Sequence, residues 1–208
     1  MLIKICGLTR AEDVQVALDL GCDLAGFIFH PQSPRYIEPS VAASFDSGNM
    51  RRVGVFVTED SDEILQIAKE ARLDLIQLHG DQSEEVAQKI GPERVIRVLW
   101  PDRYMHKGQL YQAMCKQAHC AYYLLDAGMS RGGSGKTFDW AEISGIEAPH
   151  PWFLAGGLRA KNIVLAMQEF SPDGLDLNSG LEEAPGIKSK AKMEEAVNLI
   201  RQYLAHGK

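Results

Sequence analysis

Eight short apolar runs alternate along the chain with segments whose polar and apolar residues follow a helical period. The starts of these runs are about 21 to 30 residues apart, which is the length of one strand followed by one helix. We therefore predict eight strands, most of them followed by a helix. The runs are Leu2–Cys6, Leu24–Phe29, Arg52–Val57, Leu73–Leu78, Arg94–Trp100, Ala121–Asp126, Pro151–Ala155 and Gly174–Asn178.

Capping residues indicate where the intervening helices begin. Thr or Asp followed three residues later by Glu can satisfy the exposed amides of a first helical turn. Gly21 and Gly91 are expected to end two helices, because glycine readily adopts the left-handed conformation that follows a helix. Weaker helical patterns cover Glu38–Ser47 and Lys107–Ala118. The predicted helix starts are Thr9 with Glu12, Asp60 with Glu63, Asp81 with Glu84, and Asp139 with Glu142.

Eight strand-plus-helix units favour an α/β fold of one domain, a (β/α)8 TIM barrel over residues 1–208. The length is near the lower limit of about 200 residues for that fold. An open doubly wound sheet is the alternative, but it usually has fewer strands, and the sequence has no Gly-x-Gly-x-x-Gly turn. No linker or low-complexity segment divides the chain.

Composition narrows the functional classes. The net charge of −6 argues against a general nucleic-acid or anionic-membrane surface. No apolar run approaches the roughly 20 residues of a membrane span, and the first residues do not form a signal peptide. The four cysteines lack Cys-x-x-Cys spacing, so we expect free thiols in the cytoplasm and no zinc site.

Polar residues cluster at the predicted carboxyl ends of the strands, where the active site of a barrel lies. Lys4 and Cys6 share one face of the first strand, and Asp176 and Asn178 share one face of the last, because side chains alternate along a strand. The other members are Gln77, His79 and Asp126. This clustering favours a pocket.

Asp126 ends an apolar run and precedes a long glycine-rich loop. Such a carboxylate either caps its strand or is delivered to a pocket, and we favour the pocket. We expect the loop Gly128–Lys136 to close over a substrate. Its Gly135-Lys136-Thr137 is similar to the end of a Walker A motif, but Ser130 occupies the position of the required first glycine.

Cys6 and Arg35 are two further candidates. Cys6 is either a buried structural thiol or a nucleophile or base, if nearby cations or amide dipoles lower its pKa. Pro31 and Pro34 stiffen the loop that carries Arg35, so fixing this side chain on a ligand costs less conformational entropy. Its planar guanidinium can pair bidentately with a ligand carboxylate. A solvated surface arginine is the alternative.

Two glycine-rich segments follow the seventh and eighth strands. Gly156-Gly157 and Asn178-Ser179-Gly180 are expected to bind phosphate through backbone amides, as these loops do in many barrels. Tight turns would explain the same glycines. His79 is expected either to orient a substrate or to be satisfied by its neighbours.

Seven motifs, in order along nearly the whole chain, resemble those of phosphoribosylanthranilate isomerase of tryptophan biosynthesis. The family usually has a serine where this chain has Asn178. The motifs are Lys4–Thr9, Ser33–Tyr36, Gly54–Val57, Gln77–Gly80, Gly132–Trp140, Leu154–Leu158 and Asn178–Gly180.

The resemblance implies an Amadori rearrangement of an aminoaldose to an aminoketose without cofactor or metal. It implies Asp126 as general acid, Cys6 as general base, Arg35 on the anthranilate carboxylate and Asp176 on substrate polar groups. The expected partner is a small phosphosugar, and the sequence is compatible with a monomer. The alternatives are the histidine-pathway sister isomerase or a dual-substrate isomerase, a non-catalytic phosphosugar-binding barrel, and a P-loop nucleotide hydrolase.

Overall fold

Eight parallel strands form a closed barrel in the computed structural model, which describes residues 1–126 and 144–206. The predicted helix start at Asp139 and the loop Gly128–Lys136 lie outside these ranges. The barrel strands are β1 (Leu2–Ile5), β2 (Leu24–Ile28), β3 (Arg51–Phe56), β4 (Leu75–Leu78), β5 (Val95–Leu99), β6 (Tyr122–Asp126), β7 (Trp152–Ala155) and β8 (Gly174–Leu177). The α-helices are α1 (Ala11–Asp19), α2 (Pro39–Ser44), α3 (Ser61–Glu70), α4 (Glu84–Ile90), α5 (Lys107–Lys116), α6 (Ala160–Phe170) and α7 (Lys190–His206).

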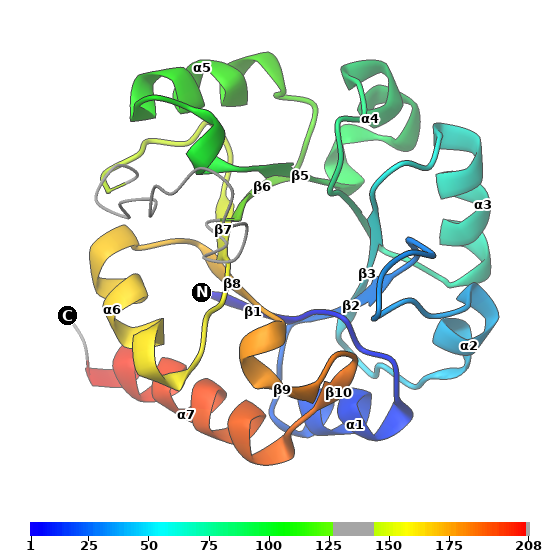
Figure 1. The fold of residues 1–208 in the computed structure, drawn as a ribbon, viewed down its shortest axis with the longest axis vertical. Helices are drawn as coiled ribbons and strands as arrows, with labels where there is room; N and C mark the ends of the chain where they lie inside the picture. The colour runs from blue at the N-terminus through cyan, green and yellow to red at the C-terminus, as the bar shows by residue number, and fades with distance from the viewer. Residues whose placement is uncertain (127–143, 207–208) are drawn as a thin grey trace.

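Each barrel strand pairs in parallel with its neighbours in chain order, and β8 closes the ring by pairing with β1. Figure 1 looks through this ring and shows the helices around its outside. The closing contact aligns Lys4 with Asp176, and the β6–β7 contact aligns Asp126 with Ala155. Because all eight strands run the same way, their carboxyl ends share one rim. The predicted (β/α)8 barrel is confirmed.

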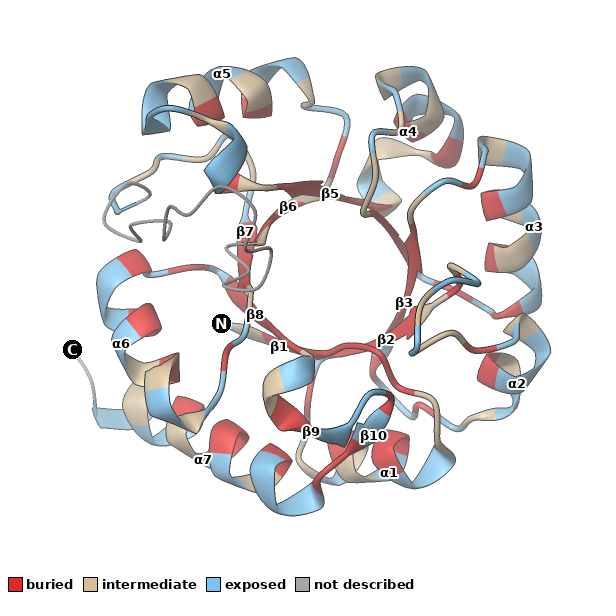
Figure 2. Ribbon diagram, viewed as in Figure 1, coloured by how far each residue is buried: buried red, intermediate tan, exposed pale blue. Residues whose placement is uncertain are grey.

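Apolar side chains form two layers separated by the strands. In β5, Ile96 and Val98 belong to the cluster inside the ring, whereas Val95 and Leu99 pack outside it. Figure 2 shows the buried residues along the strands and on the helix faces turned toward them. No helix in the described ranges is long and apolar enough to cross a membrane. The inner cluster contains Leu24, Val53, Leu75, Ile96, Val98, Leu124, Phe153 and Ala155.

The helix starts test the capping predictions. Asp60 is the N-cap of α3, and its carboxylate accepts hydrogen bonds from the amides of Asp62 and Glu63, as predicted. The other two described starts were predicted wrongly. Helix α1 begins after Arg10 rather than Thr9, and α4 begins after Ser83 rather than Asp81.

A small antiparallel hairpin follows the last barrel strand and was not predicted. After the short 3-10 helix η4 (Ser179–Leu181), β9 (Glu182–Ala184) pairs with β10 (Ile187–Lys188). Figure 1 shows this hairpin beside α1. The hydroxyl of Thr9 donates a hydrogen bond to the carbonyl of Gly186. Thr9 therefore holds the hairpin and does not cap a helix.

Candidate active site

A buried ion pair joins the first and last barrel strands directly below the rim. The Lys4 ammonium lies 2.9 Å from Oδ1 of Asp176, and both side chains are buried. The two residues face each other in the β1–β8 register, and alternation turns them into the barrel. Asp176 therefore holds Lys4 in place, a contact that the predicted role of Asp176 toward substrate did not include.

Cys6 continues from β1 and lies beside this pair. An added Cβ on Gly26 of β2 would be 2.9 Å from the Cys6 sulfur, so the glycine provides space for the thiol. Burial raises the pKa of Cys6, and the nearby Lys4 ammonium opposes that rise without cancelling it. From the sequence, a role of Cys6 as nucleophile or base depends on a lowered thiol pKa, and the structure does not lower it. At neutral pH the resting side chain is a thiol.

Asp126 ends β6 at the same rim, and His79 lies next to it. Nε2 of His79 is 3.7 Å from Oδ2 of Asp126, and Nδ1 of His79 is 3.1 Å from the side-chain nitrogen of Gln77. An amide nitrogen can only donate, so Nδ1 accepts and the proton of a neutral imidazole lies on Nε2, toward Asp126. The imidazole and the ring of Trp100 are nearly perpendicular, with ring centroids 5.4 Å apart. His79 therefore has Gln77 at one ring nitrogen and Asp126 near the other.

Arg35 reaches the mouth of the barrel from the loop after β2. Its Nε and Nη2 donate to the two carboxylate oxygens of Glu182, at 2.8 and 2.7 Å. Its stem passes over Gly7, where an added Cβ would be 2.8 Å from the arginine Cδ. The alternative of a solvated surface arginine is wrong, because the side chain is fixed by an ion pair.

The two predicted phosphate loops lie against each other. An added Cβ on Gly180 would be 2.0 Å from the carbonyl oxygen of Leu158, so only glycine permits this approach. Gly156 and Gly157 have φ angles of 108° and 66°, which L-residues with side chains rarely adopt. Apart from its two neighbours in the chain, no described residue has an atom within 4 Å of a Cβ built on Gly157, so this side of the glycine is open. Ser179 is the first residue of the short helix η4, which also contains Gly180.

Asn178 precedes that helix and is engaged by a buried cation. Lys188 donates to the backbone carbonyl of Asn178 at 3.2 Å and to its side-chain Oδ1 at 2.8 Å. The asparagine side chain is therefore turned to Lys188. A phosphate in this loop would meet backbone amides rather than the Asn178 carbonyl oxygen.

A model of the family described as N-(5'phosphoribosyl)anthranilate (PRA) isomerase matches residues 3–199. The chain belongs to this family. A PRA isomerase from Desulfovibrio desulfuricans is 53% identical over 198 residues, which cover 95% of this chain and 94% of that protein. Another, from Maridesulfovibrio salexigens, is 42% identical over 204 residues and covers 97% and 99% of the two chains.

Solved structures of PRA isomerases share the fold. The enzyme from Thermotoga maritima superposes with a TM-score of 0.85 at 32% identity, covering 97% of this chain and 99% of that one. A PRA isomerase in complex with reduced 1-(o-carboxyphenylamino)-1-deoxyribulose 5-phosphate superposes with a TM-score of 0.79 at 30% identity. That comparison covers 97% of this chain and 100% of the other.

Two buried residues of this PRA isomerase family member were missed from the sequence. Glu182 pairs with Arg35, and Lys188 pairs with both Glu182 and Asn178. Both missed residues lie in the hairpin, whose segment has no apolar alternation. The nearest sequence signal was the position of Glu182 shortly after the Asn178-Ser179-Gly180 motif.

Proposed function

We propose that this protein converts N-(5'-phosphoribosyl)anthranilate into 1-(o-carboxyphenylamino)-1-deoxyribulose 5-phosphate in tryptophan biosynthesis. The family match and the relatives over almost the entire chain support this activity. The observation that favours catalysis over mere binding is the shared rim, where a thiol follows β1 and a carboxylate ends β6. One group can give a proton and the other can take one.

In the first step, Asp126 acts as general acid. Its proton goes to the ribose ring oxygen, the bond from that oxygen to C1 breaks, and the nitrogen lone pair forms a cationic Schiff base. His79, whose Nε2 lies 3.7 Å from Oδ2 of Asp126, is well placed to stabilise the anion left after proton transfer.

In the second step, the Cys6 thiolate removes the proton from C2. The electrons of the C–H bond form a C1–C2 double bond, and the cationic nitrogen becomes neutral. The resulting enolamine loses its hydroxyl proton and gains one at C1, which gives the ketone. Lys4, adjacent to Cys6, stabilises the thiolate while that charge exists.

Substrate binding uses the two charged ends of the molecule. Arg35 binds the anthranilate carboxylate, while Gly156, Gly157, Ser179, Gly180 and the backbone of Asn178 bind the phosphate. Asp176 contacts a sugar hydroxyl while it holds Lys4. Guanidinium and carboxylate are both planar and pair bidentately, and backbone amides of glycine-rich loops are suited to phosphate.

The fluorescence of phosphoribosylanthranilate tests this function directly. Purified protein should consume the substrate without added metal and in the presence of EDTA, and Cys6→Ala or Asp126→Asn should each lower kcat by about 10² to 10⁴. A protein that binds the product analogue without turnover would be a non-catalytic phosphosugar-binding barrel.

Two further results would point to other enzymes. Turnover of the corresponding histidine-pathway aminoaldose would identify a dual-substrate isomerase, and magnesium-dependent phosphate release would identify a nucleotide hydrolase. Cys6, where the sister enzyme carries an aspartate, favours the tryptophan-pathway reaction. We also propose that the protein is cytoplasmic, needs no cofactor and is a monomer. Light scattering of the purified protein would reveal any larger assembly.

A further inference from the structure

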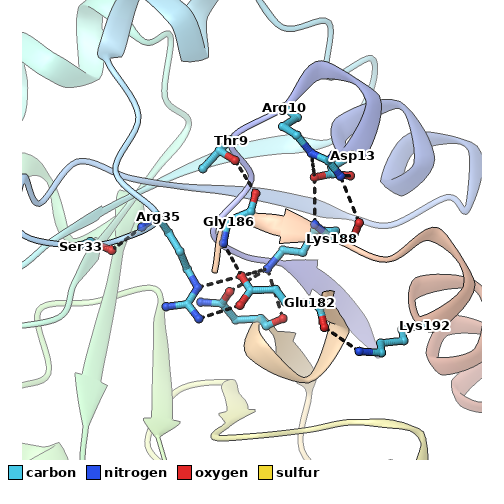
Figure 3. Close-up of polar contacts among 10 residues, drawn as sticks. Thr9, Arg10, Asp13, Ser33, Arg35, Glu182, Gly186, Lys188 and Lys192 are labelled. Atoms are coloured by element: carbon cyan, nitrogen blue, oxygen red, sulfur yellow. Dashed lines mark hydrogen bonds and ion pairs between the residues drawn. The ribbon is translucent and has the colours of Figure 1, made fainter. Parts of the chain in front are cut away.

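Glu182 is a buried carboxylate at the start of β9 with cations on two sides. Its oxygens accept hydrogen bonds from Arg35, from the Lys188 ammonium at 2.9 Å and from the amide of Gly186 at 3.2 Å. The Glu182 side chain is 5% exposed, and that of Arg35 is 20% exposed. Figure 3 shows this group of contacts. Such a fully hydrogen-bonded carboxylate has a fixed position.

The guanidinium of Arg35 has two edges that can pair with a carboxylate, and Glu182 occupies one of them. Nε and Nη2 pair side-on with the carboxylate. A guanidinium has a second fork, formed by Nη1 and the other hydrogen of Nη2, which can pair end-on with another carboxylate. Glu182 is the only carboxylate within ion-pair distance of Arg35 among the described residues. Side-on pairing therefore orients the guanidinium and leaves its end-on fork for a ligand.

The same carboxylate connects Arg35 to the predicted phosphate loop. Lys188 is fully buried and donates both to Glu182 and to the backbone and side-chain oxygens of Asn178. The hairpin itself is held to α1, since Asp13 accepts from the amide of Lys188 and Arg10 donates to its carbonyl. One hydrogen-bonded network thus runs from the arginine to the loop after β8.

We propose that Glu182 is a positioning residue that orients Arg35, and so sets the preference of the site for an aryl amine that carries a carboxylate. This inference rests on the proposed role of Arg35. Because Lys188 links Glu182 to Asn178, the same network holds the guanidinium in place relative to the predicted phosphate loop. Without Glu182, Arg35 would sample several rotamers, and the aryl carboxylate would lose its bidentate partner.

A purely structural role for Glu182 makes a different prediction. If the carboxylate only stabilised the hairpin, its loss would weaken the binding of every phosphosugar ligand to a similar extent. An orienting role instead weakens the ligands that carry the aryl carboxylate and spares those that lack it. The ratio of two dissociation constants separates the two cases, and it does not depend on the fraction of protein that is folded.

Isothermal titration with two ligands measures that ratio. The ligands are reduced 1-(o-carboxyphenylamino)-1-deoxyribulose 5-phosphate and its counterpart without the carboxylate. In the parent protein the first should bind more tightly, and in Glu182→Gln this preference should fall about tenfold or more, the worth of a bidentate charged pair. Glu183→Gln is the matched control, because it removes the same charge from the exposed neighbour. It should keep the parental preference.

Two further variants separate the possible failures. Glu182→Asp retains the charge on a shorter side chain, so it should fold even if Glu182→Gln does not, and it should also lose preference. Arg35→Ala should abolish the preference. If Arg35→Ala abolishes it while both Glu182 variants keep it within about twofold, the positioning role is refuted. If Arg35→Ala keeps it, the proposed carboxylate role of Arg35 is refuted, and this inference with it.

Discussion

Replacing Glu182 by Gln should reduce stability most at neutral pH and least in acid. The hydrogen bonds and charges of Arg35 and Lys188 outweigh burial and lower the pKa of Glu182 from 4.5 to about 2. A lowered carboxylate pKa contributes stability above its unfolded value, and that contribution is lost as the pH falls through the folded value. At 1.36 kcal/mol per unit, the charged carboxylate contributes about 3 kcal/mol at pH 7 and about 1.5 kcal/mol at pH 3.

Urea unfolding followed by circular dichroism at pH 7, 4 and 3 measures this change. The difference in unfolding free energy between the parent protein and Glu182→Gln should shrink by about 1.5–2 kcal/mol from pH 7 to pH 3. A constant offset from new contacts of the glutamine cancels in this comparison. Glu183→Gln controls for the change in net charge. A parent–variant difference that stays the same at pH 7 and pH 3 would show that the carboxylate is not stabilised by its cations.

Four other predictions concern the rim. Gly26→Ala should destabilise the fold by about 1–3 kcal/mol and lower kcat, because its methyl would be 2.9 Å from the Cys6 sulfur; urea unfolding and turnover check both. In the parent protein, raising the pH forms thiolate at Cys6 but removes the proton that Asp126 must carry, so kcat/KM should stay level through neutral pH and fall only above the raised thiol pKa, beyond about 8.5; a fall that begins near pH 7 would contradict this. Lys4→Met should lower the free energy of unfolding by about 3–5 kcal/mol, because it leaves the buried carboxylate of Asp176 without its partner. Urea unfolding should show that the double variant with Asp176→Asn recovers part of this loss. Gly157→Ala should raise KM and cost about 1 kcal/mol, because its φ of 66° strains an alanine; kinetics that match the parent would argue against phosphate binding there.

Local patterns were enough to predict the barrel. Its strands are short apolar runs, and each of the eight barrel strands lies within one or two residues of its predicted run. Burial on both faces of a parallel strand leaves this signature in the sequence, and it does not depend on distant contacts. Helix starts were less predictable. Thr9 and Asp60 have the same capping spacing, but only Asp60 caps a helix, because the hairpin takes the Thr9 hydroxyl.

The ionic contacts of the site could not be predicted from local patterns. Lys4 and Asp176 are 172 positions apart, and Arg35 and Glu182 are 147 apart. Only the closure of the barrel brings β1 next to β8 and the hairpin next to the loop after β2. The sequence indicated which residue types were available at the rim. It could not indicate which charges pair with each other before any substrate binds.

The raised pKa of Cys6 has a consequence for how the two proton-transfer groups work together. The proposed mechanism requires the thiol to be ionised while Asp126 is protonated, whereas burial favours the neutral thiol in the free protein. The active form is therefore a minor one, but a base with a higher pKa removes a carbon-bound proton more effectively. Ring opening places a cationic nitrogen one carbon from the proton to be removed, and this charge favours the thiolate at that moment. Lys4 adds a permanent positive charge that Asp176 largely balances, so it reduces the cost of the buried thiolate without forming one at rest. In the proposed mechanism, Cys6 is therefore a thiol between turnovers, and the cationic intermediate favours its conversion into the base.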